Sequence, residues 1–376
     1  MYSAGAAASS RLDRVTISFA RGIPAPECLP VEALADCARE AIRSDGHTIL
    51  SYGSTLGYAP LREWIADRHG VEPGRVLATN GSLQAFHFVL SSLGAGRVIV
   101  ERPTYDRPRG ILVEEGRELD EVCVDTDGLD VDELEHVCSN GSPPALLYTI
   151  PTFQNPTGVT LSEDRRRRLA RFARERSLPV LEDDPYGLVR FDGESLPSLF
   201  ELEGGETVMY SSSFSKTVAP GLRVGYAIVP NALAAELEPL AASTYITPAL
   251  VAQATLCEFL RRGLFDSNLE RVRGLLRLRR DAMLEALEQE LGGRATWSHP
   301  EGGYFLWLEL PEDVDASELL VRARESGVTF VPGVDFGGAP NTARLAFSFV
   351  SPDEIVEGVR RLGQLVAAAP AAVELG

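Results

Sequence analysis

The protein has 376 residues, of which 44% are hydrophobic, enough for a large core in one or two domains. Its formal net charge is −18 and it has no long basic run, so nucleic acid and anionic membranes are excluded as expected partners because its field repels phosphates. The five cysteines are scattered without a C-x-x-C pair, which excludes a disulfide framework and a zinc knuckle and fits a reducing cytoplasm.

The beginning of the chain is small and uncharged. It lacks the basic start and apolar core of a signal peptide, and no apolar run in the sequence approaches membrane-spanning length. We therefore predict a disordered tail over residues 1–14 of a soluble, cytoplasmic protein. An apolar run from Val15, ended by Gly22 and two prolines, predicts an extended segment, and a helical pattern follows from Val31 to Ser44.

Short apolar runs alternate with helical stretches through the middle of the chain. Several of these runs are too uniformly apolar to have a face in water, which predicts an α/β fold with a mostly parallel sheet covered by helices on both sides. A long helical pattern after about residue 248, an alternating strand and a final helix from Pro352 to Ala367 predict a second, α+β part. The strands of the sheet are expected at Arg75–Thr79, Val98–Arg102, Ala145–Ile150, Pro179–Asp183, Thr207–Ser212 and Val224–Val229.

Polar side chains follow these strands where they end, and ligands of open parallel sheets bind at such carboxyl ends. The turn T-N-G-S-L-Q places Ser82 near a helix start, where free N–H groups and the helix dipole favour an anion. With two further serines and Arg223 it predicts a phosphate pocket, although Ser82 is also an ordinary helix cap. The strand-end residues are Gly81, Ser82, Tyr105, Asn155, Asp183, Tyr186, Ser213, Ser215 and Lys216.

Lys216 is the only lysine, since the other 35 of the 36 Lys and Arg residues are arginines. An amine can lose its proton and attack a carbonyl, whereas a guanidinium stays protonated. Any lysine chemistry therefore belongs to Lys216. On this fact alone, a stray surface lysine in an arginine-biased chain remains an equal alternative.

Three consecutive carboxylates, Glu182, Asp183 and Asp184, close the fourth predicted strand. Adjacent carboxylates repel one another unless a cation neutralises them. One interpretation is a magnesium site, but the chain has no H-E-x-x-H motif and no D-x-D-x-D set, so we expect no metal. The other is that one carboxylate pairs with a cationic ring nitrogen of a cofactor.

A phosphate pocket, an aldehyde-reactive lysine, a carboxylate for a ring nitrogen and an aromatic stacking group together indicate pyridoxal 5′-phosphate. The motifs that carry these groups occur in one order along the chain: I-S-F-A-R-G-I-P, Y-G-S-T-L-G-Y-A-P-L-R, T-N-G-S-L-Q, E-R-P-T-Y, I-P-T-F-Q-N-P-T-G, E-D-D-P-Y, S-S-S-F-S-K-T-V-A-P-G-L-R-V-G-Y, P-E-G-G-Y-F-L-W and R-L-A-F-S. From about Val15 to Ala367 the chain resembles the fold-type I pyridoxal-phosphate aminotransferases of class I/II. Within them it resembles the branch of 2-aminoadipate and kynurenine aminotransferases.

The resemblance implies roles for individual residues. Lys216 matches the lysine that forms the Schiff base with the cofactor and carries a proton. Asp183 matches the partner of the pyridine nitrogen, and Asn155 and Tyr186 match the residues that hydrogen-bond the phenolic oxygen. The residues implied to stack on the ring or to hold the phosphate are Tyr105, Ser82, Leu83 through its backbone, Ser213, Ser215 and Arg223.

The resemblance also implies partners and a substrate site. Tyr52 matches a tyrosine that reaches the phosphate of the neighbouring subunit, which implies a homodimer. Arg344 matches the arginine that clamps the substrate α-carboxylate, with Gly22 and Asn155 close by. Each residue also has a plain structural reading: the tyrosines can be packing residues, Asn155 a turn residue before a proline, and Arg344 a surface arginine.

The chain departs from the family pattern in places that bear on the substrate. The family segment F-A-G-G-x-P reads F-A-R-G-I-P here, which puts Arg21 beside the expected carboxylate site. Arg107 and Arg109 add positive charge after Tyr105. We hypothesise that Arg21, with Arg107 or Arg109, neutralises an acidic side chain such as that of glutamate or 2-aminoadipate, with 2-oxoglutarate as acceptor.

The resemblance implies a large cofactor-binding domain over residues 46–270 with a mostly parallel seven-stranded sheet. It further implies a small domain over 271–376, against which residues 15–45 pack. The function it implies is transfer of an amino group from an L-amino acid to a 2-oxo acid. The alternative is a lyase or an amino-acid oxidase or hydroxylase on the same scaffold. Some transcription regulators carry this fold behind a winged helix, but about 14 residues before the core leave no room for a DNA-binding domain.

Overall fold

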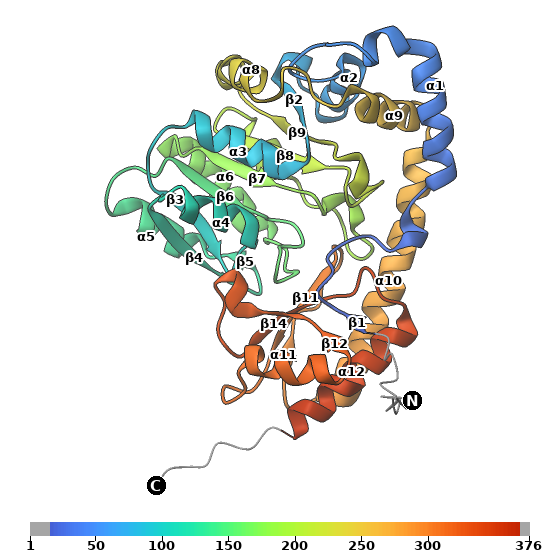
Figure 1. Ribbon diagram of the computed structural model, residues 1–376. Coiled ribbons are helices and arrows are strands. Elements are labelled where there is room, and N and C mark those ends of the chain that lie inside the picture. The colour runs from blue at the N-terminus through green and yellow to red at the C-terminus, as the bar shows by residue number, and fades with distance from the viewer. Residues whose placement is uncertain (1–15, 369–376) are drawn as a thin grey trace, which may run out of the picture.

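A computed structural model of the chain describes residues 16–368, so the tail predicted over residues 1–14 lies outside the described part. Its centre is an eight-stranded sheet with strand order β2-β9-β8-β7-β6-β3-β4-β5 (Figure 1). Strands β8, β7, β6, β3 and β4 run parallel, whereas β9 is antiparallel to both neighbours and β5 is antiparallel to β4. The strands are β2 (Val76–Thr79), β3 (Val98–Arg102), β4 (Leu119–Asp125), β5 (Gly128–Leu129), β6 (Leu146–Thr149), β7 (Val180–Asp183), β8 (Val208–Ser213) and β9 (Gly225–Ile228).

Helices cover both faces of this sheet, as the apolar strands predict. Successive strand residues point to opposite sides, so Val180 of β7 packs in one apolar core and Leu181 packs in the other. One core contains α2 (Ala59–His69), α5 (Val131–Ser139), α6 (Glu163–Arg176) and α7 (Leu199–Glu203). The opposite core contains α3 (Ser82–Ser92), α4 (Asp106–Glu114) and α8 (Asn231–Tyr245).

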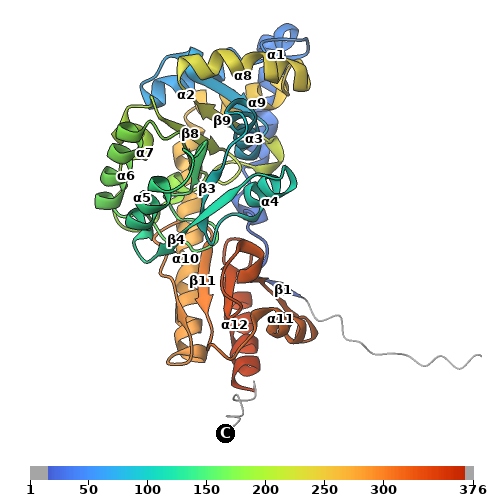
Figure 2. The same ribbon diagram turned by 90° about the vertical axis from the view of Figure 1, so that its left-hand side faces the viewer.

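A second, antiparallel sheet lies beside the first, in the lower half of the view in Figures 1 and 2. Its strand order is β10-β11-β14-β13, and the start of the chain joins this part because β1 pairs with β12. The predicted fold class, a large α/β part with a smaller α+β part, is confirmed. The elements of this part are β1 (Ile17–Ser18), β10 (Thr296–Trp297), β11 (Phe305–Glu309), α11 (Ala316–Glu325), β12 (Val328–Thr329), β13 (Val331–Pro332), β14 (Thr342–Ala346) and α12 (Pro352–Ala367).

One long helix, α10 (Leu264–Leu291), connects the two parts. Helix α1 (Val31–Ile49) packs against α9 (Leu250–Arg261), and α10 runs from there along the second sheet to pack on α12 (Figure 1). The predicted division between residues 270 and 271 falls inside α10 and stays a prediction. The large sheet has one strand more than the seven expected. Over residues 16–368, no helix combines the length and the apolar character that crossing a bilayer requires.

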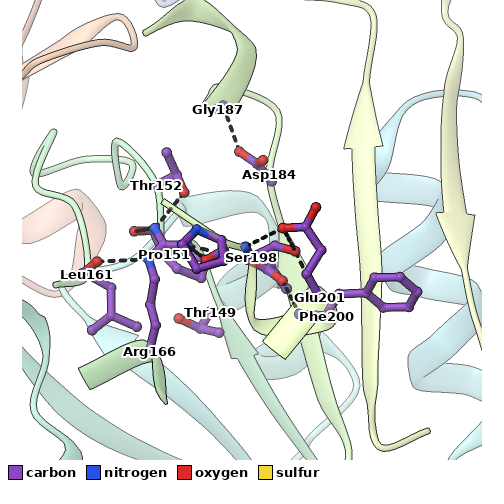
Figure 3. Close-up of polar contacts among 12 residues, drawn as sticks. Thr149, Pro151, Thr152, Leu161, Arg166, Asp184, Gly187, Ser198, Phe200 and Glu201 are labelled. Atoms are coloured by element: carbon purple, nitrogen blue, oxygen red, sulfur yellow. Dashed lines mark hydrogen bonds and ion pairs between the residues drawn. The ribbon is translucent and has the colours of Figure 1, made fainter. Parts of the chain in front are cut away.

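The start of α7 is fixed by a capping box (Figure 3). The backbone N–H of Glu201 donates to Oγ of Ser198 over 3.0 Å, and the Glu201 carboxylate accepts from the Ser198 N–H over 2.8 Å. The capping box does not use the N–H of Phe200, the residue before Glu201. This N–H donates instead to the side chain of Glu182 over 2.9 Å.

Candidate active site

The main cavity of the described chain has a volume of about 610 Å³ and lies at the carboxyl ends of the parallel strands. Its walls come from both sheets, because Phe305 and Arg344 of the second sheet face the loops that follow the strands of the first. The residues predicted from the sequence that line it are Gly22, Gly81, Ser82, Leu83, Tyr105, Arg107, Asn155, Asp183, Tyr186, Ser213, Ser215, Lys216, Arg223 and Arg344.

Lys216 lies in the turn after β8 and points into this cavity. Its Nζ donates to the Gly22 carbonyl over 2.7 Å, and the backbone carbonyl of Lys216 accepts from the Tyr304 hydroxyl over 2.9 Å. Burial lowers the pKa of the Lys216 amine to about 8, and the positive charges of Arg344 and Arg223 act in the same direction. A larger share of the amine is therefore neutral near pH 7 than for a lysine in water.

Asp183, the last residue of β7, is 4% exposed and faces the cavity from the strand side. Its Oδ2 accepts from the Tyr148 hydroxyl over 2.8 Å, while Oδ1 has no hydrogen-bond partner within residues 16–368. Burial raises the pKa of Asp183 to about 7. A buried carboxylate with a free oxygen fits a cationic N–H donor such as a protonated pyridine ring.

The other two carboxylates of the acidic triplet turn away from the cavity. Oδ2 of Asp184 accepts from the Tyr210 hydroxyl over 2.9 Å, and Oδ1 accepts from the Gly187 N–H over 2.7 Å (Figure 3). Glu182 lies 3.9 Å from Arg166 instead. The three carboxylates do not converge, and the part of the chain that the structure describes holds no group of three or more His, Cys, Asp or Glu side chains that could bind a metal ion.

An anion cup lies at the start of α3. Ser82 is the first residue of this 11-residue helix, so its end of the cavity has unpaired backbone N–H groups. Gly81 has a φ of +86°, and a Cβ there would lie 2.7 Å from Nη2 of Arg223, so only glycine leaves this guanidinium in place. Oγ of Ser213 donates to Oγ of Ser215 over 2.8 Å, which brings two hydroxyls together. These groups fit a phosphate.

Arg344 on β14 is 8% exposed and lies between two aromatic rings. Its Cζ is 4.3 Å from the ring centre of Phe305 and 4.7 Å from that of Phe336. Nη1 donates to Oδ1 of Asn155 and Nη2 to the Ala20 carbonyl, both over 3.0 Å, whereas Nε has no partner among the described residues. A buried guanidinium with a free donor fits a carboxylate.

Three residues expected at the site do not line the cavity. The exposed guanidinium of Arg21 lies 5.0 Å from the ring centre of Phe349, and Tyr52 is 82% exposed. Arg109, from the same hypothesis, pairs with Glu121 over 3.2 Å. Of the three arginines considered for an acidic substrate, only Arg107 lines the cavity, at whose mouth it lies 3.5 Å from Asp106.

The structure adds residues that sequence reasoning missed. Tyr148 is a tyrosine inside an otherwise apolar strand, and the parallel register that pairs it with Leu181 brings it beside Asp183. Its polar atom in the run L-L-Y-T was the available signal. Phe305 and Phe336 come from parts of the chain far from the strand ends, so no local pattern could have placed them against Arg344.

Comparison with known proteins gives consistent results. The family described as aminotransferase class I and II matches residues 22–362. A 2-aminoadipate transaminase of Thermus thermophilus is 41% identical over 366 residues, which cover 93% of this chain and 89% of that protein.

Two solved structures are similar over nearly the whole chain. One is an alpha-aminoadipate aminotransferase from Thermus thermophilus complexed with N-(5′-phosphopyridoxyl)-L-leucine, with a TM-score of 0.89, 39% identity and coverage of 94% of this chain and 92% of that one. The other is a kynurenine aminotransferase of Pyrococcus horikoshii, with a TM-score of 0.90, 34% identity and coverage of 96% and 93%.

Proposed function

The chain belongs to the class I and II aminotransferases, and from this premise we propose how its residues perform the transfer. It is a pyridoxal-phosphate-dependent enzyme that moves an amino group from an amino acid to a 2-oxo acid. When bound, the cofactor supplies an aldehyde that condenses with amines and a ring that withdraws electrons from the substrate Cα. The observation that carries the proposed roles is that the only lysine shares one cavity with a buried carboxylate, an anion cup and a buried arginine.

Lys216 is the proposed nucleophile and proton carrier. Its Nζ would hold the cofactor through the aldehyde group, for which it must be the neutral amine, and the lowered pKa of about 8 favours that form. The same Nζ then takes the proton that the substrate Cα releases and gives it back during the transfer. Its contact with the Gly22 carbonyl over 2.7 Å supports a position beside the proposed substrate site.

Asp183 and its neighbours are proposed to hold the cofactor ring. When the cofactor is bound, the free Oδ1 of Asp183 would accept from the ring nitrogen, while Tyr148 fixes the other oxygen. A carboxylate there would keep the nitrogen protonated. Asn155 and Tyr186 would donate to the phenolic oxygen, and Tyr105 would stack on the ring. Ser82, Leu83, Ser213, Ser215 and Arg223 hold the phosphate, as their place around the helix start supports.

The substrate is proposed to bind through its α-carboxylate at Arg344. Because both substrates of a transamination carry an α-carboxylate, one arginine serves both half-reactions. Gly22 lies beside this site, and a Cβ there would be 2.6 Å from the Phe305 ring. Arg107 is the proposed partner of a second, distal carboxylate, with 2-oxoglutarate as acceptor and an acidic amino acid such as glutamate or 2-aminoadipate as donor. The name of the Thermus thermophilus relative supports this choice.

The enzyme is proposed to act as a homodimer in the cytoplasm. Three exposed side chains, Leu50, Tyr52 and Ile246, lie near one another because Thr247 bonds to both the N–H and the carbonyl of Gly53. Such a patch supports a partner surface. All five cysteines are free thiols, which supports a reducing compartment.

A complementation experiment tests the shared site. Lys216→Ala and Tyr52→Ala proteins are mixed under conditions that exchange subunits. If Tyr52 serves the neighbouring subunit, mixed dimers contain one site with both residues intact, and activity exceeds that of either parent. Activity that stays at the sum of the parents would place Tyr52 in its own subunit or outside the site.

Product analysis tests the reaction itself. Protein loaded with pyridoxal phosphate is mixed with single amino acids, without an acceptor. Transfer releases one 2-oxo acid per site and stops until a 2-oxo acid is added. Continuous release of ammonia, or uptake of oxygen, would instead indicate the lyase or oxidase alternative. Glutamate should react far better than its neutral analogue glutamine, and Arg107→Ala should remove that preference.

A further inference from the structure

Two buried charged side chains grip the loop that carries Asn155, and neither of them lines the cavity. Arg166 on α6 is 1% exposed and Glu101 on β3 is 2% exposed. The gripped segment, residues 150–157, follows β6 and precedes α6. No proposed role in the reaction uses either charge, so their burial needs another explanation.

Arg166 holds the beginning of the loop with its whole guanidinium (Figure 3). Nη2 donates to the Pro151 carbonyl over 2.8 Å and to Oγ1 of Thr152 over 2.7 Å. Nε donates to the Leu161 carbonyl over 2.8 Å, and Nη1 to the Pro197 carbonyl over 3.2 Å. Two of its four acceptors are therefore atoms of this loop and none is a carboxylate, because its carboxylate neighbour, Glu182, is 3.9 Å away.

Glu101 holds the middle of the same loop. Its Oε1 accepts from Oγ1 of Thr149 over 2.6 Å and from the N–H of Ile150 over 3.1 Å, and its Oε2 accepts from Nε2 of Gln154 over 3.0 Å. Gln154 in turn holds the end of the loop, because its Oε1 accepts from the N–H of Thr157 over 2.9 Å. Burial raises the pKa of Glu101, and the three donors oppose that rise.

Buried charged side chains such as Arg166 and Glu101 do not by themselves stabilise a protein core. Buried charges without a close partner are destabilising compared with apolar side chains of the same size. They persist where hydrogen bonds fix a conformation that the chain would otherwise leave. The loop has such a conformation, since Phe153 has a φ of 49°, in the left-handed region that side chains disfavour.

We propose that Arg166 and Glu101 are positioning residues that fix the amide of Asn155 and, through it, the guanidinium of Arg344. The link is the hydrogen bond from Nη1 of Arg344 to Oδ1 of Asn155, over 3.0 Å between two side chains that are 8% and 4% exposed. If the loop shifts, this bond is lost and the donors of Arg344 no longer face the substrate carboxylate. This inference rests on the proposed function of Arg344.

Binding of glutarate to the loaded enzyme, measured by calorimetry, tests the proposal without using turnover. Arg166→Met removes the hydrogen bonds of the guanidinium, and Glu101→Gln keeps the shape but turns an N–H group toward Gln154. Both are expected to raise the glutarate Kd about tenfold, because the Arg344 guanidinium would lose a charged hydrogen bond to the glutarate carboxylate once Asn155 no longer aligns it. Arg166→Lys keeps the charge and part of the bonding and should recover part of the affinity. It also serves if Arg166→Met does not fold.

The matched control is Arg97→Met. Arg97 is 6% exposed and also donates to three backbone carbonyls, those of Val137, Asn140 and Ser142, none of which lines the cavity; unlike Arg166, it pairs in addition with a carboxylate, that of Asp120. This variant should lose thermal stability as Arg166→Met does but keep the glutarate Kd of the wild type. An equal loss of glutarate affinity in the control would overturn the positioning role.

A double-mutant cycle decides whether the two charges act through Asn155. In an Asn155→Ala background, Arg166→Met and Glu101→Gln should change the glutarate Kd by less than about twofold. A full tenfold loss in that background would refute the proposal. Arg344→Gln separates the two levels: if it binds glutarate like the wild type, the proposed carboxylate site and this inference fail together. If it loses binding while the loop variants do not, only the inference fails.

Discussion

Asp183 is predicted to make the cofactor-free fold less stable at neutral pH than an asparagine would. Burial raises its pKa from 3.8 to about 7. Each pH unit between these values corresponds to about 1.4 kcal/mol, so keeping the carboxylate ionised at pH 8 costs the folded state about 4 kcal/mol. The substitution Asp183→Asn removes this cost but leaves a buried N–H group without an acceptor, which costs about 1–3 kcal/mol. We expect a net gain of about 1–3 kcal/mol at pH 8.

The pH dependence gives this prediction its sign. Between pH 4 and 7 the folded protein binds the Asp183 proton more readily than the unfolded chain, so the contribution of Asp183 to the stability of the wild type falls as pH rises through this window. Urea unfolding should therefore show Asp183→Asn as more stable than the cofactor-free wild type by about 1–3 kcal/mol at pH 8, with the gain turning into a loss of up to about 1–3 kcal/mol near pH 4, where only the cost of the buried N–H group remains. Asp36→Asn on the surface is the control, with a change below about 0.5 kcal/mol at either pH.

The same variant separates stability from function. Although more stable at pH 8, Asp183→Asn should bind pyridoxal phosphate more weakly, because an amide does not neutralise a cationic ring nitrogen. The reasoning would be refuted by a loss of stability at pH 8, or by a gain of the same size at pH 4. A gain in stability at pH 8 that shrinks toward low pH, together with weaker cofactor affinity, would show that the buried Asp183 carboxylate destabilises the cofactor-free fold and strengthens cofactor binding.

Three further predictions concern the cofactor and a fourth concerns its phosphate. Lys216→Arg should lose about a thousandfold in transfer rate while keeping the positive charge, and borohydride should label only this position in the wild type; residual activity in the variant would contradict the role. In stopped-flow mixing, cofactor capture by the wild type should accelerate as pH rises through about 8, where the amine loses its proton, and a flat profile from pH 6 to 9 would count against it. Tyr148→Phe should weaken cofactor affinity about tenfold through the lost hydrogen bond to the buried carboxylate, as fluorescence titration can measure, and unchanged affinity would show that the bond does not matter. Gly81→Ala should displace the Arg223 guanidinium and weaken inhibition by inorganic phosphate, whereas Gly74→Ala, which meets no atom within 4 Å, should not.

The strands that position the site were predictable because they are apolar on both faces. Val98–Arg102 was placed at the observed bounds, and five others were within one residue at each end. Leu119–Asp125 was missed because most of it is only half-buried and its sequence, L-D-E-V-C-V-D, mixes charges with apolar residues. A partly exposed strand near the sheet edge lacks the uniform apolar run on which the prediction depended.

The two positioning residues of the Asn155 loop, Arg166 and Glu101, were much harder to predict. Arg166 is one of four consecutive arginines, and sequence composition does not distinguish the buried one from its neighbours. Helical spacing offers a signal, since Arg166 precedes the buried residues Leu169 and Ala173 by three and seven positions and so shares their face. Arg21 lies outside the helices and strands and Arg107 lies in the first turn of α4, so no periodicity shared with buried residues told the two apart.

Strand geometry explains how three consecutive carboxylates can end one buried strand. Side chains alternate across the sheet, so Asp183 shares a face with Tyr148 and the cavity, whereas Glu182 and Asp184 point to the face covered by α6. On that face Arg166 lies near Glu182, and Tyr210 and a backbone N–H bind Asp184. The sheet therefore separates Asp183 from the carboxylates of Glu182 and Asp184, which reduces the repulsion expected from the sequence. Asp183 keeps one oxygen free on the cavity side. The guanidinium of Arg166, which holds the Asn155 loop, also lies 3.9 Å from Glu182, the residue before Asp183, so one side chain lies behind both segments that carry proposed ring-binding residues.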